Sequence, residues 1–154
     1  MEIVKVKQSY YDLLESNHLN DEILINKDGR PCVLIVRLKY REKLTDFVVP
    51  IRSNISPTTP HSQYLSLPPN SGTKPKHHHG VHYIKMFPID SSKYIDKFHY
   101  TSEDHFSKAA SVIAAHEKEI VQACQNYLII YESGGGSPYT PNIAGITDLL
   151  SQFK

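Results

Sequence analysis

Residues 30–54 constrain the fold of this chain more than any other stretch, and they read RPCVLIVRLKYREKLTDFVVPIRSN. Residues 32–38 and 47–51 are apolar runs of β-strand composition that flank a charged connection centred on residues 40–43. This pattern predicts an antiparallel hairpin with a longer loop. Because side chains alternate along a strand, the apolar residues of the second run share one inward face, on which Ser53 comes next.

The open end of this hairpin gathers polar groups that suit a phosphate. Ser53 ends the inward face, Arg52 lies beside it, and Arg30 precedes the first strand. A hydroxyl and two guanidiniums can hold a phosphate through charge-assisted hydrogen bonds. The alternative is a strand that ends in a polar turn with solvated arginines, and these residues taken alone favour it, since exposed Arg and Ser are common.

Size and composition indicate a single globular domain over residues 1–154, with 40% hydrophobic and 21% charged residues. The net charge of +1 excludes a global basic field, so any site for a polyanion must be a local patch. The sequence opens without a signal peptide and has no apolar run of membrane-spanning length. We therefore expect a cytoplasmic protein that does not bind membranes.

The remaining pattern predicts an α+β fold. We expect a first strand over residues 2–7, a short helix that starts at a capping box beginning with Ser9, a brief strand over 64–67 and another strand over 81–87. A long helix should run from a second capping box at Thr101 to about Tyr131. A terminal helix over 143–153 should bury Ile146, Leu149, Leu150 and Phe153.

Residues 55–79 form a proline-rich stretch that we expect to be a mobile loop without a role in the core. Its end is a basic cluster, which favours a flexible basic loop or a phosphate contact, made of Lys74, Lys76, His77, His78 and His79. Together with His82 these histidines could suggest zinc, but no cysteine or HExxH helix accompanies them. We expect no metal and no cofactor. P-loop, dinucleotide-binding and nucleophile-elbow motifs are also missing from the sequence.

Several motifs in this order resemble the toxin endoribonucleases of type III toxin–antitoxin systems, the ToxN/AbiQ-like family. The opening strand followed by Ser9-Tyr10-Tyr11 is similar to that family's beginning. The segment FVVPIRS at residues 47–53 is similar to its hairpin, where a hydroxyl segment follows a proline. GVHYIK at residues 80–85 is similar to its next core strand, and the long helix agrees in place and character.

The resemblance implies a compact, twisted antiparallel sheet or barrel, related to the MazF/Kid-type toxins, with a long helix and shorter helices packed around it. It implies metal-independent, sequence-selective cleavage of cellular and phage RNA that leaves a 2′,3′-cyclic phosphate. It also implies a role in abortive infection and inhibition by a repeated small RNA antitoxin. That antitoxin would fold as a pseudoknot and join the toxin in a hetero-oligomeric toxin–RNA assembly.

Carried over by position, Ser53 falls on the catalytic hydroxyl, Arg30 near an active-site lysine and Tyr10 on an active-site tyrosine. Arg52 departs from the threonine usual in the best-known branch. In such chemistry the arginines would stabilise the phosphorane, while the acid or base would come from His79, His82 or Tyr10, among which the sequence does not choose. Lys85 and Arg37 are further candidate RNA contacts.

Two other functions are compatible with the same residues. One is a non-catalytic small-barrel RNA-binding protein that uses the basic cluster; it would bind RNA without cutting it. The other is a protein-interaction module with the proline-rich stretch as ligand; it would have no affinity for RNA even at low salt.

Overall fold

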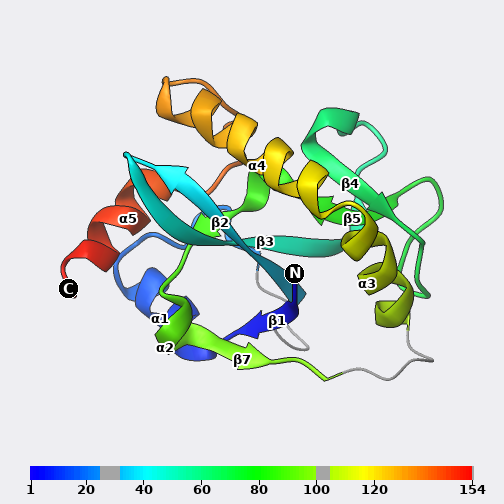
Figure 1. Ribbon diagram of the computed structural model, residues 1–154, viewed down its shortest axis with the longest axis horizontal. Coiled ribbons are helices and arrows are strands. Elements are labelled where there is room, and N and C mark those ends of the chain that lie inside the picture. Colours follow the sequence, from blue (N-terminus) through cyan, green and yellow to red (C-terminus); the bar gives the residue numbers. More distant parts are fainter. Residues whose placement is uncertain (25–31, 100–104, 154) are drawn as a thin grey trace.

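An antiparallel β-sheet with helices on both faces forms the body of the protein in the computed structural model, which describes residues 1–24, 32–99 and 105–153 (Figure 1). In this part of the chain the sheet has seven strands in the order β4-β5-β3-β2-β1-β7, and β6 pairs with β3. The α+β class is therefore confirmed, with a sheet that is open rather than closed into a barrel. The strands are β1 (Ile3–Val6), β2 (Cys32–Tyr40), β3 (Lys43–Ile55), β4 (Tyr64–Leu67), β5 (His78–His82), β6 (Phe87–Pro88) and β7 (Ile95–Lys97).

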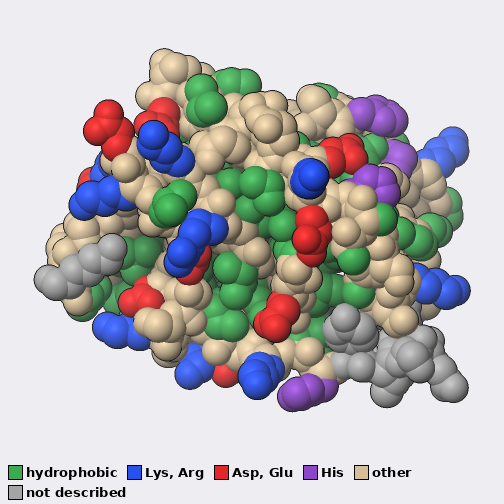
Figure 2. Space-filling model, viewed as in Figure 1, with side chains coloured by type: hydrophobic (Ala, Val, Ile, Leu, Met, Phe, Trp, Pro, Cys, Tyr) green, Lys and Arg blue, Asp and Glu red, His purple; other side chains and the backbone are tan. Residues whose placement is uncertain are grey.

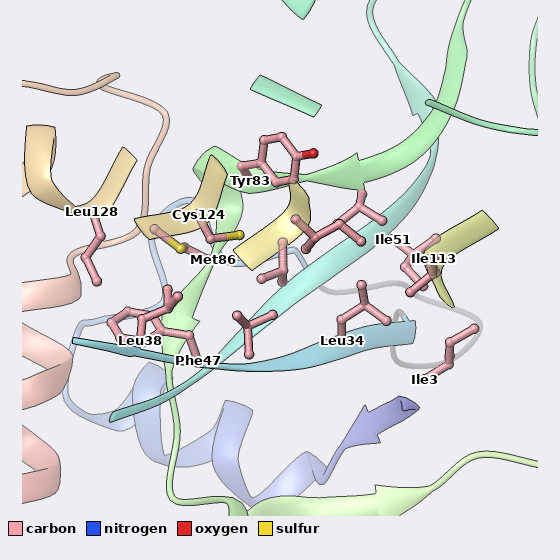
Figure 3. Close-up of a cluster of buried hydrophobic side chains, with 14 of the residues drawn as sticks. Ile3, Leu34, Leu38, Phe47, Ile51, Tyr83, Met86, Ile113, Cys124 and Leu128 are labelled. Carbon is pink, nitrogen blue, oxygen red and sulfur yellow. The ribbon is translucent and has the colours of Figure 1, made fainter. Parts of the chain in front are cut away.

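The sheet divides the hydrophobic core into two clusters, one on each face, and helices cover both. On one face of the sheet, the helices α3 and α4 and the first residue of α5 cover a cluster that includes Leu34, Phe47, Ile51, Ile113 and Leu128 (Figure 3). On the other face, α1 and α5 pack on Val33, Val48 and Phe87. The helices are α1 (Gln8–Ser16), α2 (Ser91–Tyr94), α3 (His105–Ala115), α4 (Glu117–Glu132) and α5 (Ile143–Ser151), with short 3-10 turns η1 (His61–Gln63) and η2 (Tyr83–Lys85).

The central hairpin is confirmed, but its loop is shorter than the sequence suggested. Tyr40 pairs directly with Lys43, so only Arg41 and Glu42 connect β2 to β3. Both residues have a positive φ, 51° and 65°. This is the backbone of the tight turns that match strand twist, although such turns usually contain glycine or asparagine. Because Arg41 and Glu42 are neither glycine nor asparagine, the sequence did not indicate this tight turn.

The strand expected over residues 81–87 is wrong, because η2 interrupts it. β5 and β6 flank η2, and both pair with the same edge of β3 at different places: β6 with Phe47 and Val48, β5 with residues 51–55. All residues from 79 to 89 are buried, so no alternation of apolar and polar residues could mark the turn. β7, which pairs with β1, was also not expected.

Several predicted helix boundaries also differ in the structure. Lys7 is the N-cap of α1 without a side-chain hydrogen bond, so Ser9 lies inside the helix and does not cap it. The long helix is broken at His116, where ψ is 21° and ring Nδ1 lies 2.7 Å from the Val112 carbonyl oxygen, separating α3 from α4. Its expected start at Thr101 lies outside the described residues. Phe153 lies beyond α5 and is 56% exposed rather than buried.

The proline-rich stretch contributes to the core, contrary to expectation. It contains β4, as expected, and the first residues of β5. Tyr64 and Leu67 of β4 are buried, and Leu67 belongs to the cluster beneath α4. Within the described residues, every helix is too short or too polar to span a lipid bilayer.

We predict that Glu42→Gly stabilises the protein by about 0.5–1 kcal/mol, because glycine adopts positive φ without the steric cost that other residues incur. The control is Glu119→Gly in α4, which should destabilise by about 1 kcal/mol because it lies in an ordinary helix. Urea unfolding of both variants measures the two changes. A destabilised Glu42→Gly variant would show that the turn residues are held by other contacts.

Candidate functional site

A β-bulge in β3 creates the local geometry of the candidate site. Ile51 pairs with Val81 of β5 and Arg52 with Gly80, but the next pair joins Ile55 to His78. Two residues of β3, Ser53 and Asn54, therefore stand opposite the single residue 79. Such bulges bend a strand and redirect its side chains. Here the bulge directs Ser53 and Asn54 onto the following loop.

Arg52 is held by a histidine from the neighbouring strand. Its Nη1 lies 3.1 Å from Nδ1 of His82, and a guanidinium can only donate, so Nδ1 accepts. The His82 ring is then neutral with its proton on Nε2. Burial, together with the positive charges of Arg52 and Lys85, lowers the pKa of His82 from 6.5 to about 4. His82 thus fixes the position of Arg52 without adding charge to the site.

His82 is also well shielded from solvent. The residue is 4% exposed, and its buried Nε2 has no hydrogen-bond partner among the described residues. Arg52 itself is half-buried, and burial lowers its pKa. A half-buried guanidinium with donors beyond the one used by His82 is suited to bind an anion, because partial desolvation strengthens its attraction for negative charge.

Ser53 and Asn54 attach the bulge to residues 70–74. The Ser53 hydroxyl accepts a hydrogen bond from Asn70 Nδ2 at 3.1 Å. Asn54 donates to the Gly72 carbonyl at 2.9 Å and accepts from the backbone N–H of Lys74 at 2.7 Å. These bonds bring the basic end of the proline-rich stretch next to Ser53, and they leave the Ser53 hydroxyl proton available to a ligand.

His79 lies opposite the bulge, and its ring carries the proton on Nδ1 rather than on Nε2 as in His82. Its Nδ1 is 2.7 Å from the carbonyl oxygen of Pro68, and because a carbonyl only accepts, Nδ1 carries the proton. In its neutral form the ring therefore has its lone pair on Nε2. His79 is 3% exposed and so is a buried strand residue, not the loop residue that the sequence suggested.

Aromatic rings gather beside this site. The ring of Tyr64 of β4 contacts the ring of His78 of β5 in a tilted arrangement, and exposed His61 of η1 lies against both. Figure 2 shows histidine side chains with Lys or Arg side chains nearby at the end of the molecule where β4 and β5 lie. Sequence reasoning missed His61 and Tyr64, because only the strand pairing brings them next to the histidine run.

Some predicted site residues lie elsewhere. Tyr10 is 0% exposed in the cluster beneath α1, and its hydroxyl donates to the Pro88 carbonyl at 2.5 Å. Lys85 is buried and forms an ion pair with Glu22 at 2.6 Å. Arg37 pairs with Asp46 at 3.1 Å, toward the closed end of the hairpin. Arg30 lies outside the described residues.

The structure thus brings Arg52 and His82 together, while Ser53 follows Arg52 in the bulge and is tied to the loop. His79 pairs with Leu67 and, by alternation along β5, its side chain lies on the face of the sheet opposite to that of His78 and His82. Lys74 and Lys76 are exposed, and His77 is half-buried with Nδ1 3.1 Å from the Pro75 carbonyl oxygen. Among the residues that the structure describes, no group of three or more His, Cys, Asp or Glu side chains is placed to hold a metal ion.

No protein-family model matches the sequence, and no curated protein is significantly similar to it. Among solved structures, the chain is similar to one described as "A processed non-coding RNA regulates a bacterial antiviral system", which is ToxN with that RNA. The TM-score is 0.69 at 12% sequence identity, and the match covers 96% of each chain. The resemblance to ToxN-like toxins is therefore confirmed at the level of the fold.

We predict that the lowered pKa of His82 makes the protein less stable in acid. Because folding lowers its pKa, the unfolded chain binds the proton more readily below pH 6.5, and stability falls as the pH drops toward about 4. The full effect is about 3 kcal/mol. His82→Asn keeps an acceptor for Arg52 without a titrating group, so its unfolding free energy should lose less between pH 7 and 4.

The matched control is His99→Asn, which replaces an exposed histidine and should behave as the wild type does. Urea unfolding across this pH range measures all three proteins. Equal pH dependence of the wild type and His82→Asn would contradict the buried neutral state of His82.

Proposed function

We propose that this protein is a toxin endoribonuclease of a type III toxin–antitoxin system. The observation that carries the proposal is the half-buried Arg52 guanidinium, which is held by a neutral histidine and is followed along β3 by Ser53, whose hydroxyl accepts a hydrogen bond from the loop. These groups lie on a fold shared with a protein of a bacterial antiviral system that a processed non-coding RNA regulates. A phosphodiester is the ligand that suits a guanidinium beside a hydroxyl donor.

The proposed reaction is attack of a ribose 2′-hydroxyl on the adjacent phosphorus, which forms the O2′–P bond and breaks the P–O5′ bond. The 2′-hydroxyl loses its proton and the leaving 5′-oxygen gains one, so the products are a 2′,3′-cyclic phosphate and a free 5′-hydroxyl. Negative charge develops on the phosphorane oxygens, where Arg52 supplies stabilisation that is already oriented by His82. Ser53 holds a non-bridging oxygen by donating its hydroxyl proton. Ser53 needs no covalent step, because the nucleophile belongs to the RNA.

Histidine tautomers suggest different roles for the two buried rings. His79 carries its lone pair on Nε2, the tautomer of a proton acceptor, but it lies on the face of β5 opposite to Arg52, so it would take the proton of the 2′-hydroxyl only from an RNA that reaches it beside the bulge. His82 is neutral at pH 7, since its pKa is lowered to about 4, and it acts here as a positioning residue for Arg52. Because His79 is shielded, RNA must displace part of the loop that Asn70 ties to Ser53.

The proposed partners follow from the same system. The inhibitor would be a repeated small RNA that folds as a pseudoknot and forms a hetero-oligomeric assembly with the toxin. The substrates would be cellular and phage RNAs met in the cytoplasm, and the response would be abortive infection. Single phosphate contacts at Lys74 and Lys76 would hold either RNA near Arg52.

A second candidate function is a non-catalytic RNA-binding protein, and the deep burial of both His79 and His82 favours it. In that case RNA would occupy the same surface without reaching an acid or base. Denaturing gels distinguish the two, since they reveal cleavage that native gels confuse with binding.

We predict that expression of the protein arrests bacterial growth and that Ser53→Ala relieves the arrest while leaving thermal stability nearly unchanged. The alanine loses a half-buried hydroxyl that accepts one side-chain hydrogen bond, so the fold should tolerate it. Ser62→Ala, at an exposed serine of η1, is the control and should stay toxic. Full toxicity of Ser53→Ala at equal expression would exclude Ser53 and its surroundings as the catalytic site.

We also predict that replacing Lys74 and Lys76 by alanine weakens RNA binding and flattens its dependence on salt. The log–log slope should fall by about 0.7–0.9 for each phosphate that the protein no longer binds. Lys97 and Lys118, exposed on β7 and α4, give the matched double variant, whose slope should equal that of the wild type. RNA affinity across a salt series measures the slopes, and an unchanged slope for the first variant removes the loop from the RNA surface.

A further inference from the structure

We propose that His61, Tyr64 and His78 form a stacking subsite for an unpaired RNA base next to the phosphate bound at Arg52. The inference rests on the proposed function and adds to it a place for the base. We call these three residues the ring cluster.

The ring cluster brings together side chains from three elements. The centroids of Tyr64 and His78 lie 5.2 Å apart with an angle of 30° between the ring planes. His61 lies 5.8 Å from Tyr64 and 6.3 Å from His78. Such spacings are those of interacting aromatic rings. The cluster therefore has one defined arrangement, and a base added to it would meet preformed ring faces.

Exposure differs among the rings in a way that suits a ligand. Tyr64 is 6% exposed and is the most deeply buried ring of the cluster, while His78 is half-buried and His61 is exposed. A cluster that served only to fill the core would bury all its rings. Because every nucleic-acid base has a π-face, rings of this kind can accept a base without reading its sequence.

Gly80 is the strand residue between His78 and His82 on this face. A Cβ added there would lie 2.5 Å from the Leu65 carbonyl oxygen and 3.3 Å from Cδ1 of Ile55. Glycine in a strand often marks such a close approach. With no side chain at this position, the Tyr64 and His78 rings, which flank it along their strands, have room to meet.

The strand register places the ring cluster on the same side of the sheet as Arg52 and His82. Tyr64 pairs with His82, and Arg52 pairs with Gly80, so these positions share a face with His78. His78 and Gly80 are separated by about 7 Å along β5, from the rise of a strand. A nucleotide whose phosphate meets Arg52 can therefore place a neighbouring base on the rings.

Charged side chains beside the ring cluster favour a nucleic acid over an apolar partner. Lys74 and Lys76 are exposed near the same strand end, and His77 precedes His78. An unpaired base followed by phosphate would meet rings and cations in turn. This is the arrangement by which proteins hold single-stranded nucleic acid.

The test measures binding of a fluorescent 2′-O-methyl oligonucleotide, which lacks the nucleophile and so cannot be cleaved by the proposed reaction. We expect His61→Ala and His78→Ala to weaken binding, by roughly 5- to 140-fold if one base loses its stacking partner. His61→Phe should restore binding, since it keeps an aromatic ring and removes the ring nitrogens. The control His99→Ala, at an exposed histidine of another segment, should bind as the wild type does.

The salt series separates stacking from phosphate contact. Both alanine variants should keep the wild-type slope of log affinity against log salt, whereas a slope reduced by about 0.7–0.9 would identify a phosphate contact instead. An oligonucleotide with abasic sites should bind wild type and His61→Ala equally. The inference is overturned if His61→Ala binds the intact oligonucleotide as tightly as the wild type, or if His61→Phe fails to restore binding.

The proposed function has its own readout in the same experiment. Wild-type protein incubated with an unmodified RNA either cuts it or does not, whatever the ring variants do. Loss of binding in His61→Ala without any cutting by the wild type would keep the stacking subsite and reject the nuclease. Thermal melting accompanies each variant. If His78→Ala has a lower melting temperature than the wild type, the conclusion rests on His61→Ala and His61→Phe, because His61 is exposed.

Discussion

Pairing of β3 with β5 is the interaction on which the candidate site depends. The first part of β3, from Lys43 to Pro50, pairs with β2, and only its last residues reach β5. This late pairing sets Arg52 against His82 and produces the bulge that directs Ser53 and Asn54 onto the loop. The two apolar cores hold the sheet from both sides, so the site residues lie on a rigid support.

Within the site, the burial of His82 and the position of Arg52 explain each other. A charged imidazolium beside a guanidinium in a shielded place would be strongly unfavourable, so the ring stays neutral and offers Nδ1 as an acceptor. The arrangement concentrates positive charge on one side chain rather than spreading it over two. For a phosphate ligand this gives a single oriented donor group, which is the form of stabilisation that phosphoryl chemistry uses.

The sequence predicted the elements with strong alternation or helical spacing well and the irregular ones poorly. The parity argument for Phe47, Val49 and Ile51 was correct, because those residues share one core cluster. It could not foresee the bulge after Arg52, since a bulge depends on the partner strand. The sequence also did not predict η2 or the short turn at Arg41, because neither contains the glycine, proline or asparagine that usually marks a turn. The ring cluster needs strand pairing to exist at all, whereas Arg52 and Ser53 were adjacent in the sequence.

Product analysis tests the central claim most directly. Purified wild type and Arg52→Ala would be incubated with a long RNA in excess EDTA, and the new ends would be identified by mass spectrometry. The account predicts 2′,3′-cyclic phosphate and 5′-hydroxyl ends from the wild type, at a rate at least about 100-fold above that of Arg52→Ala. Intact RNA after incubation with the wild type, or equal cleavage by Arg52→Ala, would contradict it.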